Sequence, residues 1–399
     1  DVEVIRVAIG LPSILSDSLA VSFVSILIPV LLADEQSGDT HAHNRIVWSV
    51  LIVGVVAFAV GWSTMGLQSR YLAPGISGPD QVSLIWAGRL CWVMFLAVLL
   101  SLAMRASLSV NNRIWPGAGA QFFRSTGFVV ALIVLVSLSG GATVETAAIA
   151  AVAGGLSVFV VHIVALGRAR RRIFIAAFWP APSPRYVLPI IAALALVFLS
   201  QIMGSAGRII DRALASEMAA GTLAALEYSY ALTMAVAAVT GTSSNLFLAP
   251  RIGRAFRASG RLPPDIVREI IVATALAGVA GVFCAIFADS IVQTIFQYGK
   301  FTADDVAITA AIFQLHALSL GPLVLALILT QVLLLGGLQT IVVSVSAIKL
   351  VVKIGVVTVF LSAGWGVAGL AISLGITELV SAGILVFTVL YKGLFRPNV

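Results

Sequence analysis

The sequence predicts an all-α protein that crosses a membrane many times. Of its 399 residues, 60% are hydrophobic and only 10% are charged, and the mean hydropathy is +1.08. A water-soluble domain of this size needs a larger share of polar residues to cover its surface. Because hydrocarbon offers no partner to a backbone amide, the apolar segments are expected to be helices.

Eleven segments are apolar enough to span a membrane, for which roughly 20 residues are needed. In chain order they are Leu11–Ala33, Ile46–Ser69, Val82–Met104, Gln121–Ser139, Val144–Gly167, Val187–Arg208, Thr222–Leu248, Ile266–Ala288, Val306–Leu329, Ile341–Leu361 and Val367–Tyr391. In the eighth of these, the small residues Gly278 and Gly281 predict either sliding or close packing of helices.

The loops between these spans alternate in charge. One set is rich in arginine, including Arg168–Arg172 and Arg251–Arg261, whereas the other set holds few cations. The more basic loops are expected on the cytoplasmic side, which places the C-terminus in the cytoplasm and Asp1 outside. An odd number of spans between these ends suggests that the first helix is apparently missing, and that the full bundle has twelve.

The net charge of +7 does not indicate nucleic-acid binding. The basic runs Gly167–Arg172 and Pro250–Arg261 lie directly at the ends of predicted helices. Arginines at such positions face anionic lipid headgroups and set topology. We therefore expect membrane lipids, and no nucleic acid, as partners of these residues.

An internal repeat relates the two halves of the sequence. Ser22–Leu31 (SFVSILIPVL) resembles Ser243–Ile252 (SSNLFLAPRI), and Gly78–Leu90 resembles Thr302–Leu315 at nearly the same offset. Six spans separate the copies, so both have the same orientation. This predicts two six-helix bundles in a parallel pseudo-repeat, with a substrate path between the halves. The expected domains are an N-terminal transmembrane bundle at 1–167 with about five helices present, a basic cytoplasmic linker at 168–186, and a C-terminal six-helix transmembrane bundle at 187–399.

Signatures of the common enzyme classes are absent from the sequence, which has no HExxH, no GxSxG and no P-loop. We therefore expect no catalytic residues, no metal site and no cofactor. Cys91 and Cys284 lie within apolar spans, which predicts two buried free thiols. His162 and His316 are also within spans and are expected to be hydrogen-bonded core residues.

The chemistry is expected at the few charges at membrane depth. Each such charge costs roughly 2.5–3.5 kcal/mol on insertion scales unless it is paired or hydrated. The candidates for binding a substrate are Arg89, Lys349, Lys353, Asp17, Arg208 and Arg212. The candidates for ion coupling, or for pairing with these cations, are Glu227 and Glu378.

Lys349 and Lys353 are four residues apart, so both ammonium groups leave the same face of one helix. Two like charges repel, which favours a bound anion or a facing carboxylate, and Glu378 on the next span is the expected carboxylate. The alternative is that Lys349 extends to the cytoplasmic interface while Lys353 forms a structural pair with Glu378. Arg89 and Asp17 lie at similar depth and either pair with each other or line a cavity. Arg208 is near a helix end, where extension to the interface competes with ligand binding.

A set of short motifs runs through the chain. The most informative is Asp211–Pro250, with an Asp-Arg pair, a small-residue turn and a long, weakly polar helix that ends in Ala-Pro-Arg. The others are LPSIL (Leu11–Leu15), LIPVL (Leu27–Leu31), LAPG (Leu72–Gly75), VNN…P (Val110–Pro116), YGKFTADD (Tyr298–Asp305) and AGLAIS (Ala368–Ser373). Together they resemble the MurJ/MviN family of bacterial lipid-linked glycan flippases over most of the chain. The resemblance implies the MATE-like fold of the multidrug/oligosaccharidyl-lipid/polysaccharide exporter superfamily, and an undecaprenyl-pyrophosphate-linked glycan as cargo.

The chain departs from the family pattern where pyrophosphate binders are expected. Arginines that usually follow LPxLL are replaced by Ser16 and Asp17, and another family arginine falls on Ala231. The family often has Asn-x-x-x-Asn, associated with cation coupling, where this chain has Lys349 and Lys353. A fixed ammonium group therefore either stands in for a bound sodium ion or takes over the lost phosphate binding.

The sequence thus predicts a flippase that moves peptidoglycan lipid II, or a related cell-envelope polysaccharide unit, from the inner to the outer leaflet by alternating access. The expected location is the bacterial cytoplasmic (inner) membrane, and the expected partners are the lipid-linked oligosaccharide, membrane lipids and other envelope-biosynthesis proteins. One alternative is a drug/cation antiporter of the same fold, which needs an acidic cavity. The other is a non-transporting membrane scaffold for envelope assembly, which the lost arginines favour.

Overall fold

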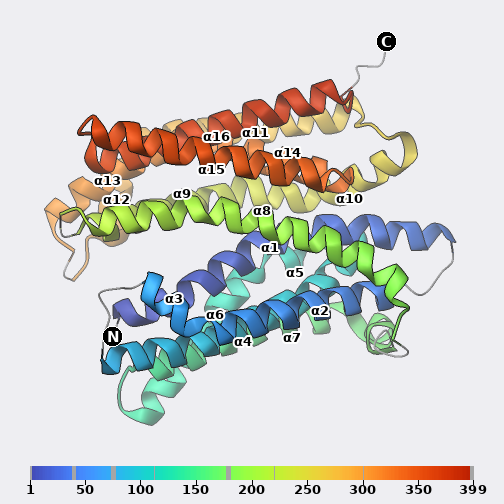
Figure 1. The fold of residues 1–399 in the computed structure, drawn as a ribbon, viewed down its shortest axis with the longest axis horizontal. Coiled ribbons are helices and arrows are strands. Elements are labelled where there is room, and N and C mark those ends of the chain that lie inside the picture. Colours follow the sequence, from blue (N-terminus) through green and yellow to red (C-terminus); the bar gives the residue numbers. More distant parts are fainter. Residues whose placement is uncertain are drawn as a thin grey trace. The chain divides into compact units, whose positions relative to one another are not determined.

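A computed structural model describes the backbone of residues 2–37, 42–72, 78–111, 113–176, 181–219, 221–299 and 301–395 (Figure 1). In these ranges every regular element is a helix. The chain divides into two compact units, Asp1–Gln201 and Ile202–Val399. The division falls within α8 (Pro184–Ser216), and the domain boundary expected at 168–186 stays a prediction.

The first unit is built around one long, largely buried helix, α4 (Pro79–Val110), which packs against α1, α2 and α7. A second close pair is formed by α6 and α7. The other helices of this unit are α1 (Val2–Ser37), α2 (Ala42–Ser63), α3 (Met65–Leu72), α5 (Trp115–Ala118), α6 (Ala120–Ser139) and α7 (Val144–Ala176), followed by the first part of α8.

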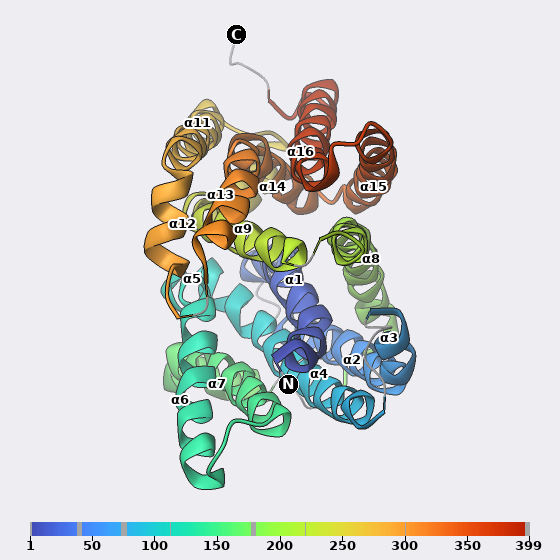
Figure 2. The ribbon, with the colours of Figure 1, turned by 90° about the vertical axis from the view of Figure 1, so that its left-hand side faces the viewer.

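The second unit is arranged in the same way around α14 (Leu320–Leu335), which packs against α11 and α16 (Figure 2) and also against α10. One apolar cluster joins α9, α11, α12, α13 and α14, and another joins α8, α9, α13, α15 and α16. The elements are α9 (Thr222–Ala237), the π-helix η1 (Ala238–Thr242), α10 (Ser243–Ser259), α11 (Pro264–Ile286), α12 (Ala288–Phe296), α13 (Ala303–Ala317), α14, α15 (Gln339–Ser362) and α16 (Gly366–Tyr391).

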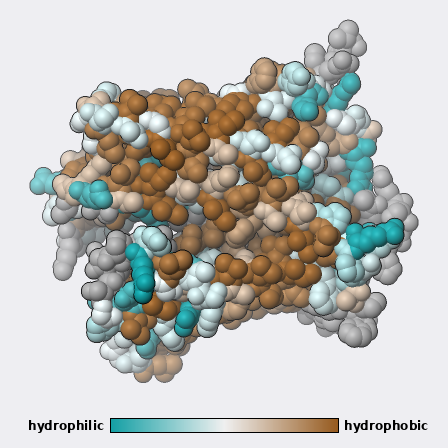
Figure 3. Space-filling view, viewed as in Figure 1, coloured by the Kyte–Doolittle hydropathy of each residue, from teal (hydrophilic) through white to brown (hydrophobic). Residues whose placement is uncertain are grey.

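The multi-pass membrane architecture is confirmed. Among the described residues, nine helices are long and apolar enough to cross a membrane, or up to ten if the bent pair α13–α14 is one span. Each of the eleven predicted spans falls on a helix or on consecutive helices of the structure. Hydrophobic side chains cover the middle of the helices on the face in Figure 3, and hydrophilic ones lie toward their ends.

Three predicted spans are broken rather than continuous. The span Ile46–Ser69 stops at Ser63, where the hydroxyls of Ser63 and Thr64 donate to carbonyls one turn earlier, a contact that bends helices. The span Val306–Leu329 bends by 49° between α13 and α14, because Pro322 is suited to the first turn of a new helix. The span Thr222–Leu248 passes through η1, where Gly241 approaches Val324 of α14 closely.

The internal repeat gains a structural meaning from this architecture. Gly78–Leu90 begins α4, and its counterpart Thr302–Leu315 begins the bent pair α13–α14, so both copies start the central helix of their unit. The other pair of repeats places Pro29 inside α1 and Pro250 inside α10. The parallel pseudo-repeat therefore relates elements with the same role in packing.

One arginine assigned to a lipid-facing helix end has protein partners instead. Arg251 of α10 forms ion pairs with Glu269, at 2.5 Å, and with Asp265, at 2.9 Å, so it ties α10 to α11. The sequence could not supply these partners, because they depend on how the helices pack.

The buried cysteines and histidines lie as predicted. Cys91 and Cys284 are free and buried. His162 Nδ1 lies 2.8 Å from the carbonyl oxygen of Val158, within α7. His316 Nδ1 lies 2.8 Å from the hydroxyl of Ser229, which joins α13 to α9.

Gly281 is predicted to be a close-packing residue rather than a sliding surface. A Cβ atom there would lie 2.4 Å from the carbonyl oxygen of Ala317, whereas one on Gly278 would meet nothing within 4 Å. Gly281→Ala should destabilise the protein by about 1–3 kcal/mol, visible as a lower thermal unfolding midpoint in detergent. Gly278→Ala is the matched control and should be neutral or slightly stabilising. Equal effects of the two substitutions would contradict this assignment.

Candidate functional site

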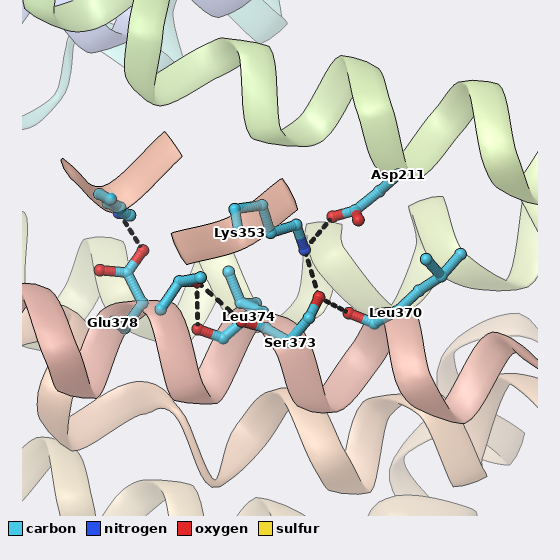
Figure 4. Close-up of polar contacts among 8 residues, drawn as sticks. Asp211, Lys353, Leu370, Ser373, Leu374 and Glu378 are labelled. Carbon is cyan, nitrogen blue, oxygen red and sulfur yellow. Dashed lines mark hydrogen bonds and ion pairs between the residues drawn. The ribbon is translucent and has the colours of Figure 1, made fainter. Parts of the chain in front are cut away.

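The candidate site is an ionic cluster in the second unit, centred on Lys353 near the middle of α15. The Lys353 ammonium lies 2.8 Å from Asp211 Oδ2 of α8 and donates to the hydroxyl of Ser373 of α16 at 2.5 Å (Figure 4). The Ser373 hydroxyl donates in turn to the carbonyl of Leu370. Only 6% of the Lys353 side chain and 14% of the Asp211 side chain are exposed. One ammonium group therefore links three helices in a buried position.

The second lysine has its own carboxylate. Lys349 Nζ lies 2.5 Å from Glu378 Oε1, and the side chains are 26% and 4% exposed, respectively. Glu378 was expected opposite the lysine pair, but its partner is Lys349 and not Lys353. The second oxygens, Asp211 Oδ1 and Glu378 Oε2, are buried and have no hydrogen-bond partner among the described residues.

Two arginines of α8 face α9 beside this cluster. Arg212 forms a two-point ion pair with Glu227, with both contacts at 2.5 Å. Arg208 lies one turn earlier on the same face, and its guanidinium carbon is 4.9 Å from the centre of the Tyr230 ring. The segment Arg208–Arg212 thus directs three charges into the second unit.

The cluster can act as a set of internal counter-ions. Removing one partner of a buried ion pair leaves an uncompensated charge, which is strongly destabilising, whereas the intact pair adds little stability by itself. Within the described residues, no group of three or more His, Cys, Asp or Glu side chains could hold a metal ion. The pairing of both lysines favours the ion-pair interpretation over the phosphate-binding one, and their role in transport stays a prediction.

The candidates of the first unit are more dispersed. Arg89 of α4 is half-buried, with its guanidinium carbon 5.8 Å from the centre of the Trp62 ring, and its buried Nε has no hydrogen-bond partner within the described part of the chain. Asp17 lies in α1, but its side chain is outside the described residues, so the predicted Asp17–Arg89 contact stays a prediction. Arg124 donates to the hydroxyl of Ser16 at 3.2 Å. Ser16 is one of the positions where the family usually has an arginine.

Sequence analysis missed Asp211 as a member of the site, although it singled out the Asp-Arg motif. Asp211 follows Arg208 by three residues and precedes Arg212 directly, so a carboxylate among cations on one helix was a usable signal. Ser373 carried no such signal, because a serine within an apolar helix usually bonds to its own backbone.

The chain was compared with families and structures of known proteins. The family model described as "Lipid II flippase MurJ" matches residues 2–396. The chain belongs to this family. The expected flippase function and MATE-like fold are thereby confirmed, and the family is one of transporters rather than a class of catalysts. No curated protein sequence matches significantly.

Solved structures agree with the family in fold. The Vibrio cholerae MATE transporter VcmN, in a mutant form, has a TM-score of 0.75 at 14% identity, over 99% of this chain and 87% of the transporter. A transporter of the MOP superfamily from Pyrococcus furiosus gives 0.73 at 17% identity, over 97% and 87%. A lipid II flippase MurJ in an inward closed conformation gives 0.66 at 12% identity, over 100% and 87%. At these identities the likeness establishes the fold alone.

The buried pair should show strong energetic coupling. Lys353→Met leaves the Asp211 carboxylate uncompensated, and Asp211→Asn leaves the ammonium uncompensated, so each should cost about 3–5 kcal/mol. The double variant should lose clearly less stability than the sum of the two single losses, because it buries no unpaired charge. Thermal unfolding of the four proteins in detergent checks this.

The pair Arg212 and Glu227 provides the control, since each of these side chains is 35% exposed. A double-mutant cycle on that pair should give a smaller coupling. Additive effects at Lys353 and Asp211 would contradict the proposed burial of their charges.

Proposed function

We propose that this chain transports a polyprenyl-diphosphate-linked glycan from the inner to the outer leaflet of the bacterial cytoplasmic membrane, by alternating access and with its C-terminus in the cytoplasm. The observation that carries the proposal is the family match over residues 2–396. Lipid II or a related envelope precursor is the cargo class, and membrane lipids surround the helices.

The physical task is to move a charged headgroup through hydrocarbon. Desolvation of a diphosphate is prohibitively costly unless protein groups replace its water. A half-buried arginine on an aromatic ring, as at Arg89 and Arg208, supplies such a group. The paired lysines hold helices together around the path, while the polyprenyl tail remains in lipid.

A drug/cation antiporter is the second candidate, because MATE transporters have the same fold. Such a protein binds cations, which requires an excess of carboxylates at membrane depth. In the described part of the second unit, the cations Arg208, Arg212, Lys349 and Lys353 instead exceed the carboxylates Asp211, Glu227 and Glu378. This balance favours an anionic cargo.

The deciding experiment is reconstitution of the protein in vesicles with a fluorescent undecaprenyl-diphosphate-linked glycan. A flippase makes the inner-leaflet probe accessible to an external reagent, and an antiporter expels a cationic dye against a proton or sodium gradient. Dye export without glycan movement would establish the second candidate. If neither activity is observed, the remaining interpretation is a non-transporting membrane scaffold for envelope assembly.

Flipping of the glycan should depend on the membrane potential. Outward movement of each negative charge is favoured by roughly 2.3 kcal/mol per 100 mV when the inside is negative. Imposing an inside-negative potassium diffusion potential with valinomycin should therefore accelerate outward flipping, and reversing the gradient should slow it. Flipping of an uncharged lipid analogue is the control, and equal rates at both polarities would contradict net movement of negative charge.

A further inference from the structure

Arg208 is the one cation of the ionic cluster that the described residues do not neutralise. Asp211 is bonded to Lys353, Glu227 to Arg212 and Glu378 to Lys349. Among the residues that the structure describes, no carboxylate lies within ion-pair distance of Arg208, and its guanidinium group instead lies over the Tyr230 ring. Four cations therefore face three carboxylates, and the single positive charge in excess resides on Arg208.

The position of Arg208 is held by its neighbours. Tyr230 makes an edge-on contact with the His316 ring, at 6.4 Å between ring centres, and His316 is fixed by its hydrogen bond to Ser229. An arginine on an aromatic face keeps its N–H groups at the ring periphery, where they can still donate hydrogen bonds. Arg208 itself is only half-buried. An anion thus finds a preorganised donor that is not fully enclosed by the protein.

The chemistry of this position suits a phosphate group. A guanidinium group presents paired N–H donors that match two oxygens of a phosphate, and such charge-assisted bonds are strong where water is scarce. The lysines are less suited, because an anion at Lys349 or Lys353 would have to displace Glu378 or Asp211. Each displacement would leave a buried carboxylate uncompensated.

We propose that Arg208, on the Tyr230 ring, is the residue of the second unit that binds the diphosphate of the lipid-linked cargo. The inference rests on the proposed function and deepens it by naming the recognising group. Phosphodiester headgroups of ordinary phospholipids share this chemistry, so the test must separate the two sources.

The experiment measures binding of undecaprenyl diphosphate, without sugar, to the full chain in detergent, by native mass spectrometry. Phosphatidylglycerol and inorganic pyrophosphate serve as competitors. Arg208→Gln should weaken binding of the diphosphate lipid at least tenfold, and Arg208→Lys should weaken it less. The matched control is the double variant Arg251→Gln/Glu269→Gln, an ion pair between α10 and α11 outside the cluster, which removes one charge of each sign and should bind like the wild type.

The outcomes are distinct. Pyrophosphate competition together with selective loss in Arg208→Gln supports the proposal. The proposal is overturned if Arg208→Gln binds the diphosphate lipid as the wild type does, or if the control loses as much binding as Arg208→Gln. It is also overturned if phosphatidylglycerol competes equally well, because Arg208 would then bind bulk lipid. If Arg208→Gln does not fold, Tyr230→Leu replaces it, because loss of the ring should also weaken binding. Wild-type protein that binds the diphosphate lipid through Arg208 but moves no glycan would refute the proposed function and leave this inference standing.

Discussion

The structure of the second unit depends on one constraint, that a charge at membrane depth has to be compensated by the protein itself. Lys353 meets it by binding Asp211 of α8 and Ser373 of α16 from its place on α15. Because an ion pair in a low-dielectric medium tolerates little displacement, this contact fixes the register of three helices at once. Its contribution to total stability is small compared with the cost of breaking it. The pair therefore contributes more to the positions of the helices than to the free energy of unfolding.

The neighbouring charges follow from the same constraint. Asp211 and Arg212 are consecutive on α8, so their side chains leave the helix in different directions, toward α15 and α9, respectively. Glu378 of α16 compensates Lys349, one turn earlier on the same face of α15. Apolar packing of Ala215 with Leu226, Ile312 and Leu370 completes the arrangement.

Much of the fold was predictable, because the bilayer simplifies the problem. Long apolar runs have to be helical, and all eleven predicted spans lie on helices. The breaks within the predicted spans were harder to predict. Pro322 gave a usable signal for the bend before α14, whereas the end of α2 depends on hydroxyls of Ser63 and Thr64 turning back to their own helix, which many unbroken helices also contain. Local sequence does not decide between these outcomes.

The site was predictable in its members more than in its contacts. Charges at membrane depth are rare, so Lys349, Lys353, Glu227 and Glu378 could be selected from the sequence alone. Which carboxylate meets which cation depends on the rotation and depth of each helix, and one turn of α15 separates the two lysines. For that reason the sequence placed Glu378 opposite the lysine pair but could not say which lysine it contacts, and Asp211 was overlooked.

The length of α8 has a mechanical consequence. The division between the compact units falls inside this helix, after Gln201, so an unbroken helical segment rather than a loop connects them. Pro189 of this helix cannot donate an amide hydrogen to the carbonyl of Arg185, so the backbone hydrogen bonding of α8 lacks one contact near its beginning. The part from Ile202 onward is instead held by the ion pairs of Asp211 and Arg212. The helix itself is therefore easiest to bend near its start, within the first unit.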